Sequence, residues 1–111
     1  MKQQQTSQLI GLLNDCARMC NQCAVACLNE KDPGMLAECI KSDLDCATLC
    51  RTAATFLERS SGNADAVLSV CGVVCDHCAD ECEKHSHMEH CRACAEICRQ
   101  CAEACQQMEH I

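Results

Sequence analysis

The chain has 111 residues, of which sixteen are cysteine and one is aromatic, and its net charge is −7. This length suits one domain with a modest core, while the negative charge and the lack of a basic patch exclude the usual nucleic-acid binders. No apolar run reaches about 18 residues, so no transmembrane helix is expected. Cysteine at this density is typical of secreted disulfide scaffolds, yet four glycines and one proline are too few for such loop-rich folds.

Four helices of similar length are predicted, separated by three short breaks. Thr6 or Ser7 is expected to cap the first helix, and Pro33 in the KDPG break suits the start of the second. The other breaks are SSGN and KHSH. The predicted helices cover about residues 6–30, 34–59, 64–84 and 87–108. Short connections predict one all-α domain over 1–111, an antiparallel up-down-up-down four-helix bundle.

Cysteine recurs in every predicted helix at spacings of three and four residues. Such spacings return to one face of a helix, so thiols occupy the stripe where Leu and Ile usually lie. The second block has Asp43 at a position where the pattern requires cysteine. The sixteen cysteines are Cys16, Cys20, Cys23, Cys27, Cys39, Cys46, Cys50, Cys71, Cys75, Cys78, Cys82, Cys91, Cys94, Cys98, Cys101 and Cys105. Four thiol stripes that face one interior predict a Cys-lined core.

The antiparallel order of the helices lets the stripes be stacked into layers. We expect four layers with four positions each, and a fifth layer for Cys91. The four are Cys16, Cys50, Cys71 and Cys105; Cys20, Cys46, Cys75 and Cys101; Cys23, Asp43, Cys78 and Cys98; and Cys27, Cys39, Cys82 and Cys94. This arrangement places all the thiols in one column roughly 16–20 Å long.

The two ends of the predicted column differ in chemistry. Leu13, Leu68 and Met108 are expected to plug one end with apolar side chains. His85 and His87 fall on interior positions at the other end, and imidazole is a common metal ligand. We therefore expect a mouth at that end, with His85 and His87 as ligands.

Four residues have two interpretations. His90, Met88 and Met35 flank the stripe near the mouth, where a ligand role and a surface role both stay open. Asp43 either reaches solvent through a local rotation, or lies inside as a ligand beside the metal or as a hydrogen-bond acceptor for thiols. Burial would raise its pKa.

Thiolates bind Zn(II), Cu(I) and iron–sulfur clusters, and the charge of the loaded core separates these choices. About four Zn(II) ions with four thiolates each would bury a charge of about −8, which is costly. Cu(I) at about one ion per thiolate replaces each proton with one positive charge and accepts two or three sulfur ligands. The sequence therefore favours Cu(I).

The blocks CARMCNQCAVAC, CIKSDLDCATLC, CGVVCDHCADEC and CRACAEICRQCAEAC resemble those of bacterial four-helix-bundle copper storage proteins, over about Thr6 to Met108. The resemblance implies storage of many Cu(I) ions on the sixteen cysteines, often in a homotetramer. Some members are exported behind a twin-arginine signal. This chain shows no such signal and so resembles the cytoplasmic type, with copper donor or acceptor proteins as its expected partners.

Three alternatives to Cu(I) storage stay open on sequence grounds. One is Zn(II) or mixed-metal thiolate sequestration, and another is a disulfide-linked structural helical protein. A redox or transfer enzyme would need an exposed cysteine of low pKa, for which Cys91 and Cys39 are the candidates. No catalytic motif is visible, so we do not expect an enzyme.

Overall fold

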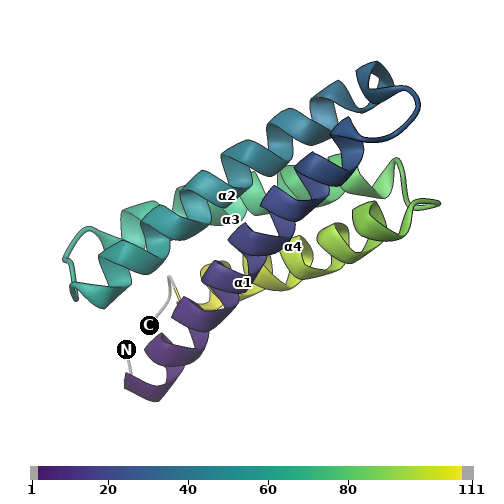
Figure 1. The fold of residues 1–111 in the computed structure, drawn as a ribbon. Coiled ribbons are helices and arrows are strands. Elements are labelled where there is room, and N and C mark those ends of the chain that lie inside the picture. Colours follow the sequence, from purple (N-terminus) through teal and green to yellow (C-terminus); the bar gives the residue numbers. More distant parts are fainter. Residues whose placement is uncertain (1–2, 109–111) are drawn as a thin grey trace.

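A computed structural model describes residues 3–108 and shows four long helices that run up and down in turn (Figure 1). The elements are α1 (Gln3–Leu28), the 3-10 helix η1 (Pro33–Leu36), α2 (Ala37–Glu58), α3 (Ala64–Glu83) and α4 (Glu89–Met108). The predicted all-α antiparallel bundle is confirmed. No helix in the described residues is both long and apolar enough to span a membrane.

The helix ends differ slightly from the predicted ones. α1 begins at Gln3, so Thr6 and Ser7 lie within its first turns and do not cap it. Gln is a good helix former, which explains why the helix extends before the expected cap. Pro33 opens η1 as the first residue of a tight turn, and α2 follows it directly.

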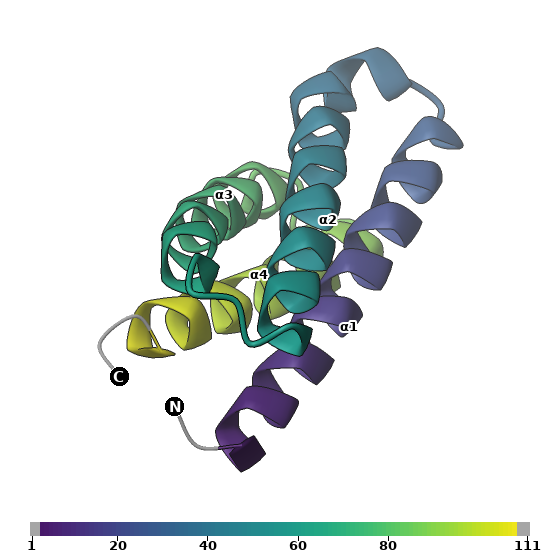
Figure 2. The same ribbon diagram turned by 90° about the vertical axis from the view of Figure 1, so that its left-hand side faces the viewer.

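The helices pack as two hairpins that form an elongated body of 45 × 19 × 18 Å. The most extensive contacts join α1 to α2 and α3 to α4, and of the four adjacent pairs of long helices α1 and α4 contact each other least (Figures 1 and 2). Small residues beside the cysteine blocks, such as Ala17, Ala79 and Ala102, are buried between helices. These small side chains let neighbouring helices approach closely enough to bring their thiols together.

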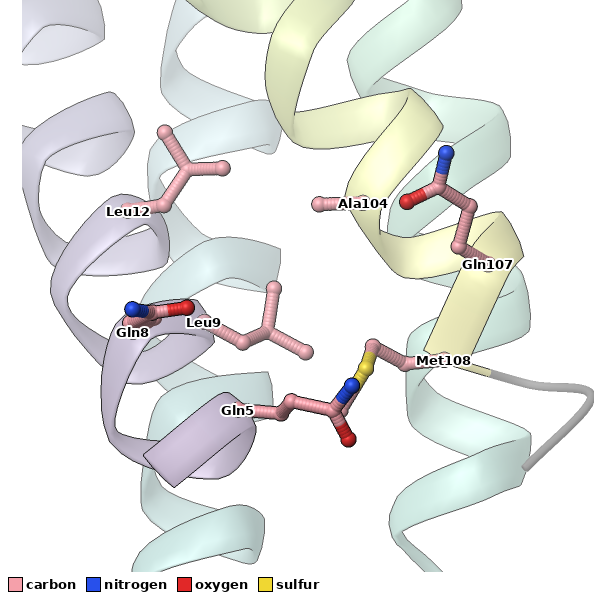
Figure 3. A pocket seen from close by; sticks show the side chains of 7 residues that line it. All are labelled: Gln5, Gln8, Leu9, Leu12, Ala104, Gln107 and Met108. Carbon is pink, nitrogen blue, oxygen red and sulfur yellow. The ribbon is translucent and has the colours of Figure 1, made fainter. Parts of the chain in front are cut away.

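Ordinary apolar packing closes the end of the bundle where α1 begins and α4 ends. Leu13 and Leu68 are fully buried, and Met108 is nearly so. Figure 3 shows Leu9 of α1 and Met108 of α4 on opposite sides of a hollow at this end. The predicted apolar plug is confirmed.

We expect this plug to stabilise the metal-free protein. Leu68→Ala should lower the free energy of unfolding by about 2–5 kcal/mol, because it removes buried methyl groups and leaves a cavity. The measurement is urea denaturation of the reduced protein with a metal chelator present. Leu44→Ala is the control, because Leu44 is about half exposed and its loss should change stability by about 0.5 kcal/mol or less. Equal losses in the two variants would contradict a stabilising plug.

Candidate metal centre

All sixteen thiols are free, and all are buried in the interior of the bundle. Neighbouring Sγ atoms from different helices lie close together: Cys46 and Cys75 are 3.5 Å apart, and Cys16 and Cys46 are 4.0 Å apart. A disulfide bond is only about 2.05 Å long, so these are packed thiols. The predicted Cys-lined core is therefore confirmed.

The layers that include α4 differ from the predicted ones. Cys98 lies 3.5 Å from Cys20, although the two were expected in different layers. Cys91 lies 3.8 Å from Cys27 and does not form a separate fifth layer. The thiols of α4 are therefore shifted by one position along the column, and the predicted register of this helix is wrong.

The turn between α3 and α4 explains the shift. Residues 84–88 form this turn, and the amide of His85 donates to the carbonyl oxygen of Cys82 at 3.0 Å. Residues at equal distances from the centre of a tight turn face each other, so Cys82 falls level with Cys91 and not with Cys94. Cys105 then becomes the additional thiol, next to the apolar plug.

Asp43 is fully buried inside the column, so the alternative in which it rotates out to solvent is excluded. Its Oδ1 accepts hydrogen bonds from the thiols of Cys78, Cys94 and Cys82 at 3.2, 3.3 and 3.5 Å. Its Oδ2 has no hydrogen-bond partner among the described residues. Burial raises the pKa of Asp43 to about 8 and outweighs the hydrogen bonds from thiols such as that of Cys78, which lower it. At neutral pH this carboxyl group is mostly protonated and uncharged.

Burial affects two thiols near the mouth, those of Cys27 and Cys91, in the same direction. It raises the pKa of Cys27 to about 11, and it also raises the pKa of Cys91. Because the interior disfavours the charged form, these thiols stay protonated at neutral pH. A metal ion that binds them must displace protons.

His90 brings an imidazole into contact with the column. Its Nδ1 lies 3.5 Å from the Sγ of Cys91, 3.6 Å from that of Cys23 and 3.9 Å from that of Cys27. Its Nε2 lies 2.9 Å from Oε2 of Glu30. The sequence left the role of His90 open. The only signal for it was its place immediately before a cysteine of the stripe.

His85 and His87 lie further out, in the turn before α4. Their rings are 6.4 Å apart, and both line a hollow of about 300 Å³ together with Met35 and Met88. We call this hollow the vestibule. Among the described residues, it is His90 that brings a histidine nitrogen within hydrogen-bonding distance of thiols.

Several sets of four donor atoms could each hold a metal ion, because all atoms of a set lie within 4.8 Å of one another. These sets include Cys16, Cys46, Cys50 and Cys75; Cys16, Cys20, Cys46 and Cys98; Cys20, Cys78, Cys94 and Cys98; Cys23, Cys27, His90 and Cys91; and Cys23, Cys39, Asp43 and Cys82. Members such as Cys20 and Cys46 belong to two sets. The first three sets are linked by shared thiols, and the last two share Cys23, which suits metal ions bridged by shared thiolates.

Comparisons with known proteins agree with this site. Residues 2–110 match the model of the family described as copper storage protein. A cytosolic copper storage protein from Streptomyces lividans, solved with five coppers, is 42% identical with a TM-score of 0.93, over 97% of this chain and 94% of that chain. The Cu(I)-bound copper storage protein BsCsp3 is 35% identical with a TM-score of 0.89, over 94% of this chain and 97% of that chain. An uncharacterized cysteine-rich protein of Bacillus subtilis, YhjQ, is 37% identical over 73% of this chain and 74% of its own length.

The raised pKa of Asp43 predicts a pH dependence of stability. Below about pH 4 this carboxyl group is protonated in both the folded and the unfolded chain. As the pH rises from about 4 to about 8 only the unfolded chain releases the proton readily, so stability should fall by up to about 1.4 kcal/mol per pH unit. Asp43→Asn should flatten this decline in urea denaturation of the reduced, metal-free protein.

Asp45→Asn is the matched control, because Asp45 lies on the same helix and is exposed. It should leave the pH dependence of the wild-type protein in place. The raised pKa of Asp43 would be contradicted if both variants followed the wild-type profile.

Proposed function

The chain belongs to the copper storage protein family, and from this premise we propose how it holds and loads its copper. The protein stores many Cu(I) ions on cysteine thiolates inside the four-helix bundle. The observation that supports this most strongly is the buried column of sixteen free thiols, in which neighbouring four-atom sets share members such as Cys20, Cys46 and Cys23. Five coppers in the Streptomyces lividans relative, and Cu(I) in BsCsp3, fit the same chemistry.

The charge of the core favours Cu(I) over divalent metals as the stored ion. The empty column holds protonated thiols, and each Cu(I) that replaces a proton leaves the total charge of the interior unchanged. Filling the column with Zn(II) would instead bury a charge of about −8. A disulfide-linked structural protein is also not favoured, since neighbouring sulfurs such as those of Cys46 and Cys75 stand 3.5 Å apart as free thiols.

We assign the stored copper to all sixteen cysteines, with Asp43 as an oxygen neighbour in the middle of the column. Three thiols donate to Oδ1 of Asp43, so a copper ion bound there would have a carboxyl oxygen within reach. His85 and His87 would meet incoming copper in the vestibule, which has thioethers of Met35 and Met88 beside them. His90 would then pass the ion to the thiols that it contacts.

We also propose that the protein works in the cytoplasm as a homotetramer and has no enzymatic activity. The Streptomyces lividans relative is described as cytosolic, and the family is a storage family. Exposed apolar side chains such as Val25, Leu28 and Val73 support contact with further copies of the chain. Copper donor and acceptor proteins would dock at the vestibule, where the column is closest to solvent.

The first experiment is an anaerobic titration of the reduced protein with Cu(I) against a chromophoric Cu(I) chelator. We expect more than about ten ions per chain, and about one proton released per ion in weakly buffered solution at pH 7. Zn(II) storage would instead release up to about four protons per ion. Binding of only one or two Cu(I) ions would overturn the storage function.

The vestibule predicts an effect on the rate of loading. The double variant His85→Ala, His87→Ala should take up Cu(I) several-fold more slowly in stopped-flow mixing, because the first ligands for the ion are gone. Its final capacity should stay close to that of the wild-type protein. His77→Ala, which removes an exposed histidine on α3, should load at the wild-type rate. A large loss of capacity in the double variant would contradict a role limited to loading.

A further inference from the structure

We infer that the mouth of the column holds a separate tetrahedral site for one Zn(II) ion, made by Cys23, Cys27, Cys91 and His90. These donors come from the C-terminal half of α1 and the first turn of α4, at the end of the bundle where the α1–α2 and α3–α4 connections lie (Figure 1). The inference goes beyond copper storage, because this site would form in the protein that holds no copper.

The spacing of the four donors fits a tetrahedral zinc ion. Bonds of about 2.3 Å to sulfur and about 2.0 Å to nitrogen give S–S edges of about 3.8 Å and S–N edges of about 3.5 Å. The Sγ atoms of Cys27 and Cys91 lie 3.8 Å apart. The Nδ1 of His90 lies 3.5, 3.6 and 3.9 Å from the three sulfurs. All four donors lie within 4.8 Å of one another, so little movement is needed to close them around an ion.

Glu30 completes the arrangement as a partner of the ligand. Its Oε2 lies 2.9 Å from the Nε2 of His90, on the side of the ring away from the thiols. A proton on Nε2 that is donated to this carboxylate leaves the Nδ1 lone pair directed at the sulfurs. A histidine ligand whose second nitrogen donates to a carboxylate is a common feature of zinc sites, and it fixes both the tautomer and the orientation of the ring.

Charge explains why a divalent ion would choose the mouth over the rest of the column. Zn(II) with three thiolates and a neutral imidazole has a charge of −1, whereas Zn(II) with four thiolates has −2. The set of Cys20, Cys78, Cys94 and Cys98 has the required spacing but lies fully buried, where a net charge is costly. The side chains of His90 and Glu30 are 24% and 40% exposed, so solvent reaches the mouth site.

A zinc ion here would cap the empty column. On binding, Zn(II) replaces three thiol protons, which are released to solvent, and holds the outermost sulfurs as thiolates. Cu(I) is the softer ion and thiolates prefer it, so arriving copper would displace the zinc and open the column. Zinc would thus protect the unloaded protein without competing for its storage capacity.

Co(II) is the probe for this site, because it occupies tetrahedral zinc sites and its visible bands report how many sulfurs bind it. Anaerobic titration of the reduced, copper-free protein should give one tightly bound Co(II) per chain with a three-sulfur, one-nitrogen spectrum. One equivalent of Zn(II) should remove these bands. Glu30→Gln should weaken Zn(II) binding by about 10–100-fold, and His90→Ala should weaken it at least as much and abolish the spectrum.

His77→Ala is the control and should bind Co(II) as the wild-type protein does, since that histidine is exposed on α3. Circular dichroism would establish whether each variant is folded. If His90→Ala does not fold, Glu30→Gln still provides the test. Two results would overturn the inference: four-sulfur spectra that persist in His90→Ala, or no binding of Co(II) and Zn(II) at micromolar concentrations. The number of Cu(I) ions bound should also be measured on the same sample. A normal Cu(I) capacity together with either result would overturn the zinc site and leave copper storage intact.

Discussion

The close packing of neutral thiols in a dry interior is the interaction on which this structure depends. Protonated cysteine is a small apolar side chain, so the same atoms that bind metal also form the hydrophobic core of the empty bundle. Neighbouring sulfurs such as those of Cys39 and Cys82 are already 3.5 Å apart before any ion arrives. Folding and metal binding therefore both require closely packed thiols in the interior. Each Cu(I) replaces a proton, so loading does not introduce charge.

Much of this architecture could be predicted from the sequence, because the spacing of cysteines within one helix determines which face they occupy. The offset between helices could not be predicted in the same way. It depends on the geometry of the connection, and the turn at 84–88 places Cys98 beside Cys20, one layer away from the expected position. The spacing of cysteines determines which face of the helix the thiols occupy. It does not determine how far along the bundle axis they lie relative to the thiols of the next helix.

The polar residues of the site were harder to predict, because their roles depend on contacts between distant segments. His90 precedes Cys91 and lies at the edge of its stripe, and only the packing of α1 against α4 brings Glu30 to its other nitrogen. Asp43 fits the cysteine pattern by position alone. Three thiols from α3 and α4 complete its surroundings, and the spacing of residues within α2 gives no information about them.

The two ends of the column give stored copper an order. Leu13 and Leu68 close one end, and the contact with solvent through His90 lies at the other. Because the column has a single opening, the last ion to be bound would be the first to be released. Copper near the mouth would exchange quickly with cellular demand, while copper near Cys105 would stay until the ions in front of it had gone. The ions bound deepest in the column would thus be those that were stored first.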